Sequence, residues 1–189
     1  MSRIRIFVEG DDDQKFIEDF LKIIDRSLPD VKVIPVEGWT KLHAAQPQFT
    51  TNTELGGTNL IIFDADDDFT QRTNDIRSKI GELGIQSELF LFPNNADSGN
   101  LDTLLVSISN PAFHPVHECF DNYSASLAAS NLDLRLPNIK HKIYTYLYSI
   151  KGDPRATKRN FLIPEHWNLK SHLLNNLKTF LSDKIMVNV

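Results

Sequence analysis

The chain has 189 residues, of which 41% are hydrophobic and 24% charged, with a formal net charge of −5. This balance is typical of a folded globular protein and unlike that of a disordered chain. No run approaches the roughly 20 consecutive apolar residues of a membrane-spanning helix, and a single cysteine, Cys119, excludes an intrachain disulfide. We therefore expect a protein of the reducing cytoplasm that has no membrane partner.

The charges are unevenly divided along the chain. Residues 1–134 carry 10 Lys and Arg against 22 Asp and Glu, a net charge of −12. Residues 135–189 carry 10 against 3, a net charge of +7. Such a division fits a metal site beside a surface that binds a polyanion. It equally fits two solvated faces that merely differ in sign, and the sequence leaves both interpretations open.

The first half of the chain alternates between apolar strands and amphipathic helices. The sequence predicts strands at residues 3–8, 31–36, 59–63 and 87–92. It predicts helices between them, after Asp11, at residues 39–49 and at residues 69–83. This alternation predicts an α/β fold, a parallel four-stranded Rossmann-like sheet with helices on both faces.

After Gly99 the pattern becomes helical. Helices are predicted at residues 101–108, 115–129, 140–148 and 169–182, with prolines in the loops between them. We therefore expect two parts, an α/β core over residues 1–105 and a helical appendage over residues 106–189 that packs on the core.

Two acidic groups follow the first and third predicted strands. The first spans residues 9–13 (EGDDD) and the second spans residues 64–68 (DADDD). Parallel strands place their following loops at one edge of the sheet, so we expect the two groups to meet. Carboxylates that converge raise one another's pKa unless a cation neutralises them. Because ligands of oxygen alone favour Mg²⁺ or Mn²⁺ over zinc, the pattern predicts a site for one of these ions.

Some of these acids have a simpler structural explanation. Four of them stand where a carboxylate can cap a helix and complement its dipole: Asp11, Asp12, Asp67 and Asp68. Glu9 and Asp64 differ, because each leaves an apolar strand, where a solvated surface charge is not expected.

The two acidic segments resemble known motifs. Residues 8–13 (VEGDDD) resemble the first TOPRIM motif, a strand that ends in glutamate, followed by glycine, two variable residues and aspartate. Residues 61–66 (IIFDAD) resemble the second motif, a strand that ends in Asp-x-Asp. TOPRIM domains occur in topoisomerases, primases, OLD-type nucleases and some recombination proteins. The resemblance covers residues 3–105 and implies a TOPRIM core.

The resemblance also implies roles for the acids. Glu9 takes the place of the glutamate that acts as a general acid or base. Asp64 and Asp66 take the places of the pair that binds Mg²⁺, and Asp13 supports the site or its metal.

A narrower resemblance concerns residues 92–105. They are similar to a segment of small bacterial TOPRIM-like proteins grouped near the OLD-type nucleases, in which a Gly-x-Leu-acid run follows the fourth strand. Asp102 stands where that run has glutamate. The resemblance implies that Asp102 completes the metal site, although its side chain is the shorter one.

The densest basic stretch lies in the rear part of the chain. Gly152 and Pro154 mark an exposed loop there. The cations in and beside this loop are Lys151, Arg155, Lys158 and Arg159. Their density predicts a surface that binds the backbone of a nucleic acid.

The sequence is compatible with three functions. The leading hypothesis is a Mg²⁺-dependent (or Mn²⁺-dependent) phosphotransfer enzyme, a nuclease that cleaves DNA or RNA. The second is a non-catalytic TOPRIM-fold binding or assembly protein with a structural or regulatory metal site. The third is a phosphoesterase of small substrates. The sequence shows no ATPase domain of the kind that OLD proteins carry, so a partner protein could supply regulation.

Overall fold

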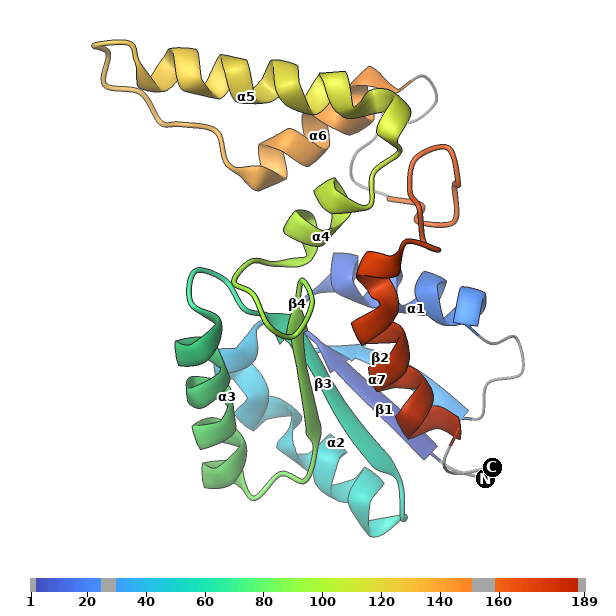
Figure 1. Ribbon diagram of the computed structural model, residues 1–189. Helices are drawn as coiled ribbons and strands as arrows, with labels where there is room; N and C mark the ends of the chain where they lie inside the picture. Colours follow the sequence, from blue (N-terminus) through green and yellow to red (C-terminus); the bar gives the residue numbers. More distant parts are fainter. Residues whose placement is uncertain (1–2, 25–29, 151–158, 187–189) are drawn as a thin grey trace.

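The computed structural model describes residues 3–24, 30–150 and 159–186, and at its centre lies a parallel four-stranded sheet (Figure 1). The strands are β1 (Arg3–Val8), β2 (Asp30–Pro35), β3 (Thr58–Asp64) and β4 (Glu88–Phe92). They are ordered β2-β1-β3-β4. The predicted α/β class is confirmed, and each strand begins and ends within one residue of the predicted position.

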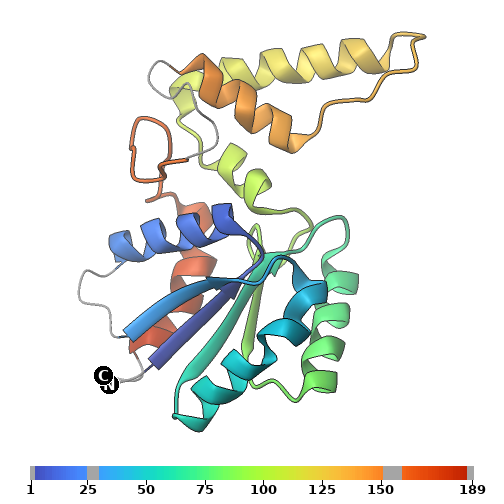
Figure 2. The same cartoon turned by 180° about the vertical axis from the view of Figure 1, so that it is seen from behind.

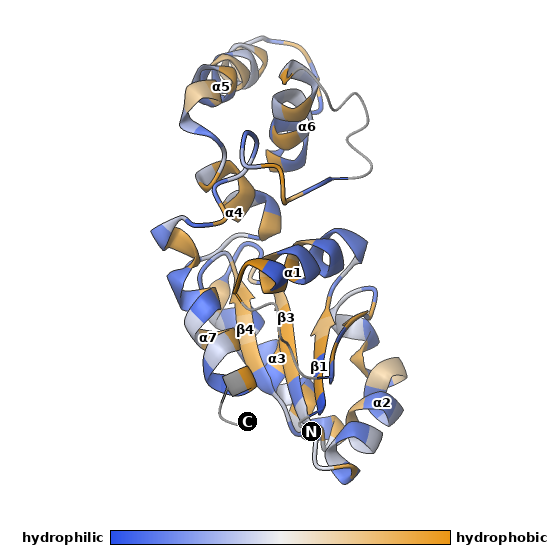
Figure 3. Ribbon diagram, turned by 90° about the vertical axis from the view of Figure 1, so that its right-hand side faces the viewer, coloured by the Kyte–Doolittle hydropathy of each residue, from blue (hydrophilic) through white to orange (hydrophobic). Residues whose placement is uncertain are grey.

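Helices cover both faces of the sheet (Figures 1 and 2). One face carries α1 (Asp11–Ile24) and α7 (Asn175–Met186), and the other carries α2 (Leu42–Glu54) and α3 (Phe69–Leu83). Side chains of a strand point alternately to the two faces. Ile4 and Ile6 of β1 accordingly pack with α1 and α7, whereas Phe7 packs with α2. Figure 3 shows the strands as the most hydrophobic part of the molecule.

The C-terminal helix α7 completes the core. Leu177 and Leu181 of α7 belong to the same buried cluster as Ile4 and Ile6. The predicted division at residue 105 falls inside α4 (Leu101–Ser107). The chain beyond α4 therefore does two things: it first leaves the sheet and then returns to cover it.

The part that leaves the sheet is a helical hairpin, which we call the arm. It consists of α5 (His114–Ala128) and α6 (Ile139–Ser149), and it stands away from the sheet beyond α4 (Figures 1 and 3). Its base is packed, since Tyr146 lies against Trp167 with ring centroids 5.4 Å apart. Within the described residues, none of the helices is both long and apolar enough to cross a bilayer.

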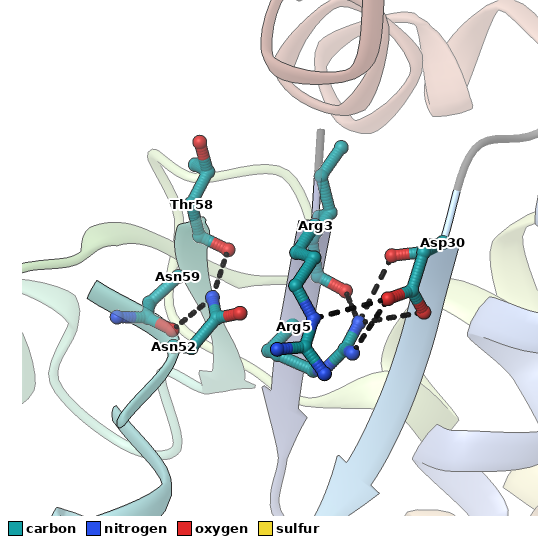
Figure 4. Close-up of polar contacts among 7 residues, drawn as sticks. Arg3, Arg5, Asp30, Asn52, Thr58 and Asn59 are labelled. Carbon is teal, nitrogen blue, oxygen red and sulfur yellow. Dashed lines mark hydrogen bonds and ion pairs between the residues drawn. The ribbon is translucent and has the colours of Figure 1, made fainter. Parts of the chain in front are cut away.

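At the amino-terminal end of the sheet, an ion pair and several side-chain hydrogen bonds connect neighbouring elements (Figure 4). Arg5 of β1 donates two hydrogen bonds to the carboxylate of Asp30 of β2, at 2.9 and 3.1 Å. Asn52 of α2 donates to the carbonyl of Thr58 at 3.1 Å and to the side-chain oxygen of Asn59 at 2.9 Å. At this end, the acid Asp30 has a cationic partner.

Candidate functional site

Glu9 and Asp64 lie together at the carboxyl edge of the sheet, which faces α4 (Figure 1). Glu9 directly follows β1, and Asp64 is the last residue of β3. The two strands are parallel neighbours, as predicted, with Val8 beside Ile62. The backbone N–H of Asp64 donates a hydrogen bond to Glu9 Oε1 at 3.2 Å, across 55 residues of sequence. Adjacent parallel strands thus bring the two acids into contact.

The Asp64 carboxylate also contacts the start of α4. Its Oδ1 accepts a hydrogen bond of 2.9 Å from the N–H of Leu101, the first residue of that helix. Asn100 caps the same helix by accepting a hydrogen bond from the Thr103 N–H at 3.0 Å. A helix start presents free N–H groups and a partial positive charge, and both stabilise a carboxylate. The segment after β4 therefore contributes to the site through its backbone.

Asp13 approaches from the first turn of α1. Its Oδ2 accepts a hydrogen bond of 3.0 Å from the Gly10 N–H, which fixes the turn between β1 and α1. Glu9, Asp13 and Asp64 are half-buried, and we call these three residues the edge cluster. The described residues form no salt bridge to any of the three.

The edge cluster resists full ionisation. Burial, together with the negative charges of Asp13 and Glu9, raises the pKa of Asp64 to about 9. Burial raises the pKa of Asp13 to about 7, with the charge of Glu9 as the next cause. Burial also raises the pKa of Glu9, although the hydrogen bond from the Asp64 N–H opposes this. At neutral pH the edge cluster therefore favours the uptake of a proton or of a cation.

Asp66 lies at the rim of the edge cluster and has a cation of its own. Its carboxylate pairs with Arg72 of α3. Its backbone exchanges two hydrogen bonds of 2.7 Å with Gly99, which ties the loop after β3 to the loop after β4. Its φ of 52° lies in the left-handed region, where Asp is one of the more frequent side chains. The charge of Asp66 still raises the pKa of Glu9 and Asp64.

Asp102 is held by Arg159. Arg159 Nη1 lies 2.8 Å from Asp102 Oδ1 and 3.6 Å from Asp12 Oδ2. The Arg159 side chain is only 2% exposed, and its guanidinium carbon lies 5.8 Å from the ring centre of Tyr144. The expectation that Arg159 is exposed to a nucleic acid is therefore wrong, because two carboxylates draw its guanidinium inward.

The other predicted nucleic-acid contacts, Lys151, Arg155 and Lys158, lie outside the described residues. Nothing in the described part of the arm replaces them as a dense basic loop. Sequence reasoning did not name Arg72, which neutralises Asp66, and it assigned Arg159 to nucleic acid rather than to the ion pair with Asp102. Arg72 carries a local signal, since it stands in the helix that follows Asp66. The distance of 57 residues between Asp102 and Arg159 leaves no such signal.

The site is not a preformed metal cage. In the part of the chain that the structure describes, no three His, Cys, Asp or Glu side chains are placed as ligands of one ion. Glu9 and Asp64 accept hydrogen bonds from backbone N–H groups, and Asp66 is paired with Arg72. The donor chemistry nevertheless fits a hard divalent cation, since the edge cluster and its rim offer carboxylate oxygens alone. A cation would have to share or replace the present hydrogen bonds.

Comparison with known proteins supplies the family. A family model described as a protein of unknown function, DUF3226, matches residues 3–185. The chain belongs to the DUF3226 family. The DUF3226 match takes in the sheet, the edge cluster, the arm and all of α7 but its last residue. Among curated proteins and among solved structures, the searches found no match.

Proposed function

We propose that the protein is a Mg²⁺-dependent or Mn²⁺-dependent nuclease that cleaves phosphodiester bonds at the edge cluster. One observation carries the proposal: three half-buried carboxylates, from β1, α1 and β3, meet at the carboxyl edge of a parallel sheet, and the described residues form no salt bridge to them. Ligand sites of open α/β sheets form at this edge. Uncompensated carboxylates there attract a divalent cation. The resemblance to the TOPRIM motifs points to the same chemistry.

In this proposal Asp64 and Asp13 would hold the cation, and Asp66 would be a further ligand if its ion pair with Arg72 opened. The bound cation would supply positive charge for the phosphate oxygens and for the attacking water. Asp102 contributes by holding Arg159, since its carboxylate is paired with that guanidinium. The assignment of Asp102 as a direct metal ligand is thereby replaced by a supporting one.

Glu9 handles the proton. Its Oε1 accepts the hydrogen bond from the Asp64 N–H, which holds the carboxyl group beside Asp64. Burial raises the pKa of Glu9 from its usual value and so brings it closer to neutrality. A carboxyl group of this kind can take a proton from the attacking water or give one to the leaving oxygen. The other oxygen, Oε2, would carry that proton.

A non-catalytic role is the second candidate, and one observation favours it. Asp66 is already paired with Arg72, and the described residues form no preformed cage. A cation could then act as a structural or regulatory ligand of a TOPRIM-like assembly protein. Such a protein would bind the cation without cleaving a nucleic acid.

Cleavage of labelled single- and double-stranded DNA and RNA, with Mg²⁺ or Mn²⁺, tests the proposal. We expect cleavage by the wild type and a loss of roughly a hundredfold or more in Glu9→Gln, because a general acid or base contributes about that factor. Asp67→Asn is the matched control, because Asp67 is exposed in the loop that follows Asp64. Cation binding without cleavage of any substrate would favour the second candidate. Hydrolysis of small phosphate esters alone would contradict both.

A further inference from the structure

The segment that joins α5 to α6 exposes three leucines in alternation. Residues 129–138 contain neither helix nor strand and run back along the arm in an open course (Figures 1 and 2). Leu132, Leu134 and Leu136 are 69%, 42% and 47% exposed. Leu132 lies in a bend, and residues 133–138 follow it without regular structure. If residues 132–136 pair as a strand, side chains at every second position come to lie on one side. Single exposed leucines are common on protein surfaces, but three exposed leucines within five residues indicate an interaction surface.

The outer part of the arm has no core beneath this run. No residue from 121 to 142 is buried, and Tyr123 on α5 is 56% exposed. The described residues also provide no hydrogen-bond partner for the backbone of residues 132–136. Unpaired N–H and C=O groups are available for pairing with a further strand.

The charged residues between the leucines indicate which strand can pair with this segment. Asp133 and Arg135 are both exposed, so the segment reads Leu-Asp-Leu-Arg-Leu. This pattern is self-complementary about Leu134. When a second copy runs antiparallel with the two Leu134 residues opposite each other, Asp133 faces the partner's Arg135 and Leu132 faces the partner's Leu136. Pairs of opposite charge directly across two strands stabilise the pairing.

We propose that residues 132–136 pair with the same segment of a second copy of this chain in an antiparallel contact with two-fold symmetry. The leucines cover one another on one side, and two Asp–Arg pairs form on the other. A two-fold contact requires a surface that is complementary to itself, which the charge order supplies. Pro137 ends the pairing, because proline has no N–H to donate.

Charge reversal tests the register. Asp133→Arg and Arg135→Asp should each weaken dimerisation by roughly tenfold or more, because each replaces two attractive cross-strand pairs with two repulsive ones. The double variant, Asp133→Arg with Arg135→Asp, should recover the wild-type affinity. Mixing the two single variants should produce a heterodimer, since each introduced charge then faces its opposite. Sedimentation equilibrium from micromolar to near-millimolar protein measures the affinities of the wild type, the three variants and the mixture.

Glu118→Arg is the matched control, because it makes the same change of charge at an exposed position of α5. It should leave the dimer unchanged, and thermal melts should show that all variants fold. A wild type that stays monomeric over the whole range would overturn the proposal. So would a dimer that ignores both single variants, or single variants that neither recover in the double variant nor associate on mixing. Nuclease activity or its absence has no bearing on these outcomes.

Discussion

Helix α1 carries two carboxylates that are shielded from water, Asp19 beside two lysines and Asp13 beside another acid. The Asp19 side chain is 0% exposed, is salt-bridged by Lys15 and by Lys22, the latter at 2.9 Å, and accepts a hydrogen bond from the Phe161 N–H at 3.3 Å. Burial alone would raise the pKa of Asp19, but the two lysines outweigh it and the pKa is lowered. Near the start of the same helix, burial and the charge of Glu9 raise the pKa of Asp13 to about 7.

The comparison distinguishes a buried carboxylate that the fold neutralises from carboxylates that it leaves without a cationic partner. A carboxylate withdrawn from water destabilises a fold unless it is neutralised. The fold neutralises Asp19 with two ammonium groups, and Asp19 then anchors the segment at Phe161. It leaves the edge cluster without such partners, at a place still open to solvent. Repulsion concentrated at one accessible point is what a cation site requires.

The largest expected effect is stabilisation by a cation. Mg²⁺ or Mn²⁺ at 100 times its dissociation constant should raise the free energy of unfolding of the wild type by about 2.7 kcal/mol. Asp64→Asn should abolish this gain, because it removes a proposed ligand while keeping an oxygen for the Leu101 N–H. Urea unfolding with and without the cation measures both values. Equal gains in the two proteins would remove Asp64 from the cation site.

Substitution of Asp19 should have the next largest effect. Asp19→Asn removes the charge that both lysines neutralise and should lower the free energy of unfolding by about 2 kcal/mol, in the range of hydrogen bonds to charged groups. In metal-free buffer Asp64→Asn should be neutral or stabilising, because it removes a carboxyl group whose ionisation is opposed by burial and by the charges of Asp13 and Glu9. The same unfolding experiment compares the two. A loss as large in Asp64→Asn as in Asp19→Asn would contradict the distinction between the two sites.

The smallest expected effect is on the pH dependence of stability, to which Asp64 and Asp19 contribute with opposite signs. The native-state pKa of Asp64 is raised, so the native protein holds a proton that the unfolded chain releases, and its metal-free stability should fall as pH rises from about 4 toward 9. Asp64→Asn should reduce the total fall over this pH range by about 1 kcal/mol or less, because solvent screens a half-buried group. The lowered pKa of Asp19 acts the other way, since its contribution is lost at acid pH below about 4. Unfolding midpoints at several pH values in EDTA would reveal both slopes.

Much of this site could be predicted from the sequence because its main signals are local. Apolar runs that end in Glu9 and Asp64 mark strand ends, and the intervening helices make the strands parallel. Asp68 caps α3 as one of the predicted capping acids, accepting a hydrogen bond from the Gln71 N–H at 2.9 Å. These patterns need only neighbouring residues.

The remainder depends on contacts between distant segments. Whether Asp102 belongs to the edge cluster or to Arg159 is decided by how the chain returns from the arm, 57 residues later. The predicted helix at residues 169–182 also begins later than expected, at Asn175, because Ser171 starts a separate short turn by accepting a hydrogen bond from the Leu173 N–H. No periodicity in the sequence reports such long-range pairings.

The return of α7 to the sheet has a consequence for synthesis on the ribosome. One face of the sheet packs against α7. Ile4, Ile6 and Phe90 therefore stay partly exposed to solvent until residues 175–186 have been made. The strands are complete after residue 92, yet the growing chain must carry an incompletely covered apolar surface through the synthesis of the whole arm. Nascent chains of this kind are prone to aggregation and are ones that chaperones recognise. The helix that closes this face of the hydrophobic core is therefore made only after the arm.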